Sequence, residues 1–177
     1  MDLTELAKTI RFDNASKGFD PLEGGINRYL LLVCSEVCEA LEELRDGHEV
    51  DEIYYDRIVT DTNPTAKTVD VSLKPEGFSV EIADAAIRIL DIQSKLELKS
   101  LLIPGSYDFK DLDNELLGVI YSIGKISMKP NDIATYLQIA LTSLFHIAEH
   151  CKFDMLTTIE LKLAYNRTRP PKHGRKF

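Results

Sequence analysis

The chain has 177 residues, of which 44% are hydrophobic and 28% are charged, and its formal net charge is −8. This length suits one domain with a substantial core, and the sequence predicts a single domain over residues 1–177. The acidic balance argues against a protein that binds nucleic acid or an anionic membrane surface.

The segment at the start of the chain lacks the apolar run of a signal peptide, and no segment has the about 18 apolar residues of a membrane span, so a cytoplasmic protein is expected.

The predicted elements are almost all helices. Apolar residues recur at helical spacing in six segments, over about 3–13, 27–46, 79–99, 111–127, 132–151 and 155–165. Together they predict an all-α bundle of five to six helices.

The ends of these helices carry recognisable signals. Gly47 is a candidate C-cap of the second helix, and Asn131 and Asp154 are candidate N-caps of the last two. Residues 48–77 are polar and contain prolines, so they are predicted to be an insertion loop or a small hairpin between the second and third helices.

Two of the helices carry acidic residues beside the apolar face rather than opposite it. Glu36 and Glu39 are three residues apart, which places both side chains on one face. Glu81 and Asp84 repeat the spacing at a matching position on the next long helix. Carboxylates at the border of a core are costly to bury unless a cation meets them, and oxygen donors suit Mg²⁺ or Mn²⁺. The four residues predict a metal site shared by two antiparallel helices in the core of the bundle.

Other charged residues lie near this predicted site. Glu43 is one turn further along the acidic stripe and is a candidate auxiliary ligand, whereas Glu42 points towards solvent. Arg88 and Asp91 lie on the corresponding stripe of the other helix. For Arg88 the sequence favours an internal ion pair over a contact to phosphate.

The end of the chain is basic, since six of the residues from 162 to 176 are Lys or Arg. Residues 166–177 form a predicted basic tail. Lys162 and Asn166 are one turn apart on the last helix, so they and Arg169 could converge on phosphate oxygens. Acidic metal ligands plus a separate cationic cluster suit a ligand made of phosphate and metal. A solvated tail without a ligand remains the alternative.

Three segments together carry a family pattern: LLLVCSEVCEALEELRDG (30–47), GFSVEIADAAIRILDI (77–92) and KLAYNRTRPPKHGRKF (162–177). Through them the chain resembles the MazG-like family of all-α nucleoside triphosphate pyrophosphohydrolases, over roughly residues 1–44, 78–100 and 154–177. The family motif E-x-x-E followed by E-x-x-D falls on Glu36, Glu39, Glu81 and Asp84. Its K-x-x-x-N-x-x-R ending falls on Lys162, Asn166 and Arg169.

The resemblance implies Mg²⁺-dependent hydrolysis of a nucleoside triphosphate, (d)NTP, between the α and β phosphates, which releases the monophosphate and pyrophosphate. It also implies that Glu36 and Glu39 act in catalysis, with Glu39 the first choice to orient or deprotonate the attacking water. Lys162 and Arg169 would hold the leaving pyrophosphate, and Asn166 would contact phosphate or sugar.

Contacts to the base are expected from the N-terminal segment, where Phe12, Asn14, Lys17 and Phe19 offer stacking and hydrogen bonds. The family also implies a homodimer or a homotetramer. The chain departs from the family pattern in two respects. Ser35 stands where many relatives have another glutamate, and the two carboxylate pairs are separated by about forty residues, which is longer than usual.

Other classes of protein fit less well. A di-iron bundle normally carries E-x-x-H, which is absent from the sequence. A P-loop is excluded because no G-x-x-x-x-G-K occurs, and the histidines form no His-Asp pair. The three cysteines form no C-x-x-C pair, so a zinc site is not indicated. The alternative from another class is a helical oligomerisation or regulatory module that binds nucleotide or metal without turnover.

Overall fold

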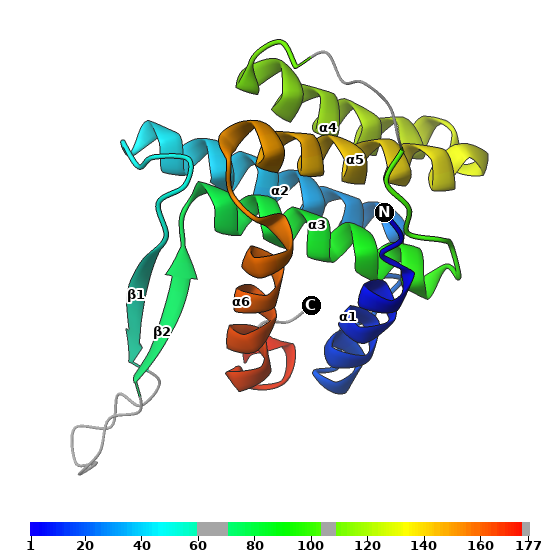
Figure 1. The fold of residues 1–177 in the computed structure, drawn as a ribbon. Helices are drawn as coiled ribbons and strands as arrows, with labels where there is room; N and C mark the ends of the chain where they lie inside the picture. Colours follow the sequence, from blue (N-terminus) through cyan, green and yellow to red (C-terminus); the bar gives the residue numbers. More distant parts are fainter. Residues whose placement is uncertain (60–70, 104–108, 175–177) are drawn as a thin grey trace.

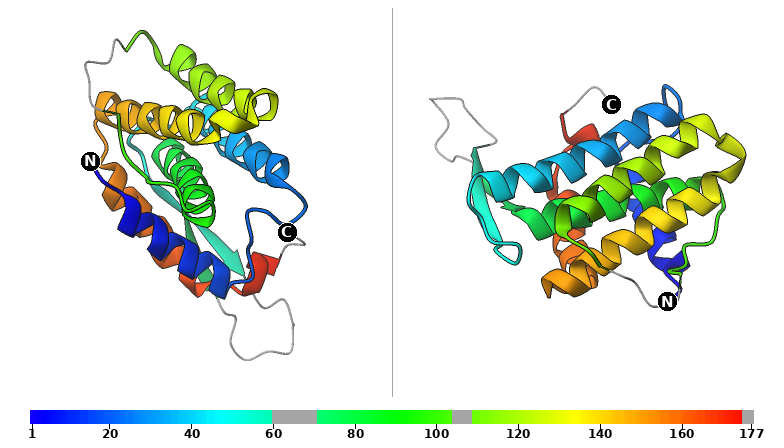
Figure 2. Two further views of the ribbon diagram at one scale, coloured as in Figure 1. Left: turned by 90° about the vertical axis from the view of Figure 1, so that its right-hand side faces the viewer. Right: turned by 90° about the horizontal axis from the view of Figure 1, so that it is seen from above.

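α3 (Phe78–Lys95) is the central helix of the computed structural model, which describes residues 1–59, 71–103 and 109–174 (Figure 1). Most of its side chains are buried, so neighbours must cover it on several sides. α2 (Ile26–Arg45) packs beside it and α5 (Ile133–Cys151) covers one face. α1 (Thr4–Ser16) and α6 (Met155–Thr168) cover the opposite face (Figure 2).

The sixth helix, α4 (Leu112–Met128), packs along α5 and also contacts α2. One contiguous apolar core takes side chains from all six helices, among them the fully buried Ile10, Val33, Ile82, Leu141 and Ile159. Burial of this kind stabilises by about 1.5–3 kcal/mol for each large aliphatic side chain. The predicted all-α fold is confirmed for the described residues.

The helix ends agree with the sequence in part. Asp154 accepts a hydrogen bond from the Thr157 amide at 2.8 Å, which confirms it as the N-cap of α6. Gly47 has a φ of 92°, and its amide donates to the Leu44 carbonyl as expected at a glycine-terminated helix. Asn131 lies within a 3₁₀ turn, Pro130–Asp132, that precedes α5, so the prediction that it caps this helix is wrong.

Three helices end elsewhere than predicted. α1 continues to Ser16, three residues beyond its predicted end. α3 ends at Lys95 and not at 99, because Glu97 takes a left-handed conformation with a φ of 56°. α6 continues three residues beyond Tyr165, to Thr168, and a 3₁₀ turn, Pro171–Gly174, follows it. The predicted tail therefore begins as helix, and its last residues, 175–177, lie outside the described part of the chain.

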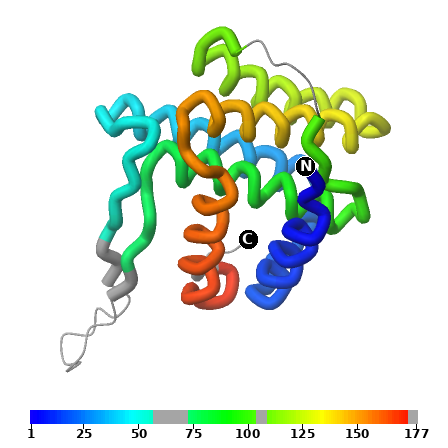
Figure 3. The backbone as a smooth tube through the Cα atoms, viewed as in Figure 1, coloured from blue at the N-terminus to red at the C-terminus, as the bar shows by residue number. Residues whose placement is uncertain are grey.

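The insertion between α2 and α3 forms a hairpin that projects beside α6 (Figure 3). β1 (Tyr54–Val59) pairs with β2 (Val71–Glu76) in antiparallel register, with Asp56 opposite Lys74 and Tyr54 opposite Glu76. The predicted hairpin is thus confirmed, although residues 60–70 of the insertion lie outside the described residues. The loop after α3 likewise includes residues, 104–108, outside them. Within the described residues, no helix has the length and apolar character to cross a membrane.

Gly77 joins the hairpin to α3 in a conformation that only glycine tolerates, with a φ of 124° and a ψ of 163°. A Cβ at this position would also meet the backbone carbonyl oxygen of Glu52 well inside contact distance. We expect Gly77→Ala to lower the free energy of unfolding by about 2 kcal/mol, measured by urea denaturation. Gly118→Ala is the matched control, because it lies in α4 with open space around the built Cβ. It should be neutral or stabilising; equal losses in both variants would contradict the strain argument.

Candidate metal and phosphate site

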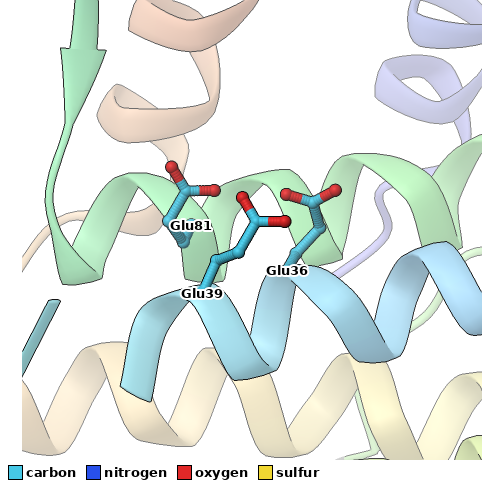
Figure 4. A group of neighbouring side chains, drawn as sticks. All are labelled: Glu36, Glu39 and Glu81. Atoms are coloured by element: carbon cyan, nitrogen blue, oxygen red, sulfur yellow. The ribbon is translucent and has the colours of Figure 1, made fainter. Parts of the chain in front are cut away.

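α2 and α3 run antiparallel and bring three carboxylates together. Contacts between them pair Tyr29 with Asp91 and Glu36 with Arg88, so the order reverses from one helix to the other. Oxygens of Glu36, Glu39 and Glu81 all lie within 4.8 Å of one another. In Figure 4 the three side chains project from the side of α2 and α3 that faces α1 and α6. The predicted convergence of acidic side chains from the two helices is present in the geometry.

The fourth predicted ligand, Asp84, has a different immediate partner. Its Oδ2 lies 2.7 Å from the Nζ of Lys162 on α6, and the same Nζ lies 3.9 Å from Glu81 Oε1. Lys162 is only 2% exposed, so its ammonium group is buried between two carboxylates of α3. Burial by itself would lower the pKa of Lys162, but Asp84 and Glu81 outweigh this effect, and the pKa is raised. The lysine therefore stays charged.

The charges around Glu81 are incompletely balanced. Burial raises the pKa of Glu81 far above its usual range, Lys162 opposes this shift, and the carboxylates of Asp84 and Glu36 add to it. A divalent cation would favour the ionised form of Glu81. Mg²⁺ binds oxygens at about 2.1 Å in octahedral geometry, so adjacent ligands lie about 3.0 Å apart and opposite ones about 4.2 Å apart. Oxygens within 4.8 Å of one another can reach that geometry through side-chain movements.

Glu36 is oriented by Arg88, which confirms the predicted internal ion pair. The Arg88 Nε donates to Glu36 Oε1 at 2.7 Å, and the Nη2 of the same guanidinium lies 2.5 Å from this oxygen. The guanidinium also lies 5.9 Å from the centre of the Tyr29 ring. Since Glu36 is only 5% exposed, these contacts fix a carboxylate that would otherwise be costly to bury.

All four carboxylates line one pocket, and so do most of the residues predicted to bind phosphate or base. Cationic and aromatic side chains line the same pocket. The residues that line the pocket include Asn14, Phe19, Arg28, Tyr29, Glu36, Glu39, Lys74, Glu81, Asp84, Arg88, Lys162, Asn166 and Arg169. The pocket thus combines an acidic cluster with cations from the hairpin, both core helices and α6.

Asp91 joins α1, α2 and α3 behind this pocket. Its carboxylate is fully buried and receives hydrogen bonds from Arg11 at 2.6 Å, Asn14 at 2.8 Å and the Tyr29 hydroxyl at 2.8 Å. Burial and the Asp91 charge raise the pKa of Tyr29, so the phenol remains protonated and donates. Asn14 uses its amide nitrogen for Asp91, and its position in the pocket wall is fixed by that bond.

The C-terminal end of α6 closes the pocket. Asn166 and Arg169 both line it, as predicted. No donor among the described residues reaches the buried Oδ1 of Asn166, which leaves an acceptor at the pocket wall. Lys17 was predicted to contact substrate, but it lies outside this pocket. Its Nζ donates to the carbonyl oxygens of Arg167 at 2.8 Å and Arg169 at 2.5 Å, so it neutralises the negative end of α6 instead.

Two further residues lie elsewhere than the sequence suggested. Glu43 accepts hydrogen bonds from the Tyr54 hydroxyl at 3.1 and 3.2 Å, so it anchors the hairpin rather than lining the pocket. Phe12 is 75% exposed on α1 and does not line the pocket, whereas Phe19 does. Only one of the two phenylalanines considered for stacking is therefore placed to do so.

Seven residues that line the pocket were not predicted from the sequence: Asp20, Glu23, Arg28, Tyr29, Leu32, Lys74 and Ile87. Arg28 and Tyr29 lie in the first turn of α2, on the acidic side of the helix, and the periodicity that located Glu36 and Glu39 could have included them. Lys74 comes from the hairpin, whose position against the helices is set by tertiary packing and is not encoded in any local pattern.

Comparison of the chain with models of known protein families, with curated proteins and with solved structures gives no match.

Proposed function

We propose that the protein is a nucleoside triphosphate pyrophosphohydrolase that uses Mg²⁺ to cleave a (d)NTP between the α and β phosphates. The observation that carries this proposal is the meeting of Glu36, Glu39 and Glu81 oxygens within 4.8 Å in a pocket that also holds Lys162, Asn166 and Arg169. One pocket is therefore lined both by carboxylates and by cationic side chains. A ligand made of phosphate and metal uses both.

The residues of the chain have distinct roles in this proposal. Glu36, Glu39 and Glu81 hold the metal, and Asp84 completes the acidic face while keeping Lys162 in place. When bound, Mg²⁺ offsets the negative charge of the phosphate oxygens and makes water more acidic. Glu39 is the most exposed of the three clustered carboxylates, and it orients the attacking water and accepts its proton.

Other side chains of the same pocket bind the rest of the substrate. Lys162 and Arg169 hold the phosphates that leave as pyrophosphate, and the Asn166 Oδ1 accepts a hydrogen bond from a sugar hydroxyl. Phe19 and Asn14 lie at the other end of the pocket, where they can contact the base.

A second candidate function is a helical module that binds nucleotide or metal without turnover. The 2.7 Å ion pair between Lys162 and Asp84 favours it, because the lysine already compensates one of the carboxylates. A panel of ribo- and deoxyribonucleoside triphosphates assayed for pyrophosphate release with Mg²⁺, and again after chelation with EDTA, separates the two. Metal-dependent release from one or more nucleotides supports the enzyme. If no nucleotide releases pyrophosphate and Mg²⁺ does not change the thermal stability, the proposed enzyme is contradicted.

We also propose that the protein forms a homodimer or homotetramer through the outer face of α4. Leu117, Tyr121 and Met128 lie on the side of this helix opposite its buried face and are 63%, 62% and 75% exposed. Leu31 of the neighbouring α2 is 70% exposed. A row of large apolar side chains at spacings of four and seven residues is typical of a helix that pairs with another helix, and a two-fold axis would pair it with its own copy.

We expect the double variant Leu117→Lys, Tyr121→Lys to sediment as a monomer while the wild-type protein sediments as a dimer or tetramer. Two charges on each helix repel across a two-fold axis and remove apolar contact. Lys110→Gln, an exposed change outside this face, is the control. Wild-type protein that sediments as a monomer at all accessible concentrations would exclude this interface.

A further inference from the structure

The hairpin brings a lysine into the pocket from outside the helical bundle. Lys74 on β2 lines the pocket, and its side chain is 27% exposed, so ligand can reach it. Along a strand, alternate side chains share a face, so Lys74 and Glu76 lie on one side and Leu73 lies on the other. Leu73 is 54% exposed, whereas Glu76 is 8% exposed, which places the Lys74 side towards the protein.

The base of the hairpin is held firmly against the bundle. Tyr54 donates its hydroxyl to Glu43 of α2, and its ring stacks on His48 with 4.4 Å between centroids. β2 contacts both α6 and α3. The backbone of Lys74 therefore has a fixed position against the bundle, although it lies in the hairpin between the two helices of the site.

The pocket has two different ends. The order of contacts along α2 and α3 runs from Tyr29 and Asp91, through Glu36 and Arg88, to Glu39 and Glu81. Eleven residues of α2 separate Arg28 from Glu39, which is about 16 Å along the helix axis. The first end carries aromatic side chains, and the second carries the carboxylates. Lys74 belongs to the second end, because β2 leads directly into the first turn of α3, which carries Glu81, and β2 also contacts α6.

Charges of alternating sign continue from the pocket onto the hairpin. Asp84 and Glu81 flank Lys162, and Lys74 forms an ion pair with Glu76. The charge of Glu76 also acts on Lys162 and raises the pKa of the lysine. The ammonium group of Lys74 thus lies at the acidic end of the pocket, and its carboxylate partner, Glu76, is nearly buried.

We infer that Lys74 binds the phosphate furthest from the nucleoside, so that the hairpin makes the pocket selective for triphosphates over shorter phosphate chains. This inference rests on the proposed function for the orientation of the substrate, with the base at the Tyr29 end and the phosphates at the Glu81 end. The lysine acts as a binding residue. It keeps its ion pair with Glu76 and donates a further charge-assisted hydrogen bond from its ammonium group to phosphate, and no covalent step is involved.

Calorimetric titration with inorganic tripolyphosphate and, separately, inorganic phosphate in excess Mg²⁺ tests this inference without turnover. We expect Lys74→Gln to weaken tripolyphosphate binding by about 10-fold, or about 1.4 kcal/mol, because one charge-assisted hydrogen bond is lost. Binding of inorganic phosphate should be unchanged, and Lys74→Arg should restore most of the affinity. Lys129→Gln, an exposed change in the turn before α5, is the control. Circular dichroism melting checks that each variant is folded.

The outcomes separate this inference from the proposed function. Equal tripolyphosphate affinities in the wild-type protein and Lys74→Gln, or no tripolyphosphate binding by the wild type, would overturn the role of Lys74. Where the wild type hydrolyses a nucleoside triphosphate, Lys74→Gln should also lower the ratio of kcat/KM for that triphosphate to kcat/KM for its diphosphate. If no nucleotide is hydrolysed but tripolyphosphate binding still depends on Lys74, the proposed hydrolysis fails and the inference stands.

Discussion

Glu39→Ala is expected to lower kcat for pyrophosphate release by about 10³-fold or more while the protein stays folded. Loss of a positioned general base alone typically costs about 10²–10⁴-fold, and this change also removes a metal ligand. Glu39 lies at the exposed rim of the pocket, within 4.8 Å of both Glu36 and Glu81, and is not part of the apolar core. Its removal therefore changes the site without opening a cavity.

The control for this variant lies one turn away on the same helix. Glu42 is exposed, pairs with Arg45 at the surface and does not line the pocket. Glu42→Ala should keep wild-type kcat and KM. Steady-state kinetics with the best nucleotide, together with circular dichroism melting, measures both variants. Full activity in Glu39→Ala, or equal loss in both variants, would remove Glu39 from the proposed catalytic site.

The sequence located the acidic cluster because helical periodicity determines direction as well as position. Residues three apart must share a face, and the apolar stripe of each helix shows which face is buried. Glu36, Glu39, Glu81 and Asp84 therefore reach one pocket, and Arg88 pairs with Glu36, as expected from local pattern alone. Local pattern does not predict which two of the four carboxylates Lys162 compensates. That depends on where α6 crosses α3.

The contacts that were predicted wrongly or not at all are those with partners in another part of the chain. Lys17 meets the end of α6, Glu43 meets the hairpin, and Asp91 gathers donors from α1 and α2. Lys74 enters the pocket from a segment that was expected only to be an insertion. In each case the partner is far away in sequence. Amphipathic pattern identifies the side chain that faces inward, but not the group that it meets.

Lys162 shows how closely the stability of this fold is tied to its site. Its ammonium group is buried between Asp84 at 2.7 Å and Glu81 at 3.9 Å, and Glu36 of α2 lies within 4.8 Å of Glu81. A buried ion pair contributes little compared with an apolar pair of the same shape, but removing one partner leaves the other as an uncompensated charge. Replacing Lys162 with an uncharged residue would leave Arg88 paired with Glu36 but no cation paired with Asp84.

Lys162→Met is expected to lower the free energy of unfolding by about 3 kcal/mol without divalent cations, and to abolish activity. Mg²⁺ at about 100 times its Kd should raise the free energy of unfolding of each protein by about 2.7 kcal/mol, if only the folded form binds the metal. Urea denaturation with EDTA and with Mg²⁺ measures both effects. Lys8→Met is the control, because its ion pair with Glu5 is exposed on α1 and its loss should not measurably change stability. If Lys162→Met unfolds at the wild-type urea concentration in EDTA, the acidic cluster does not need this lysine. If Mg²⁺ stabilises neither protein, the cluster does not bind the metal.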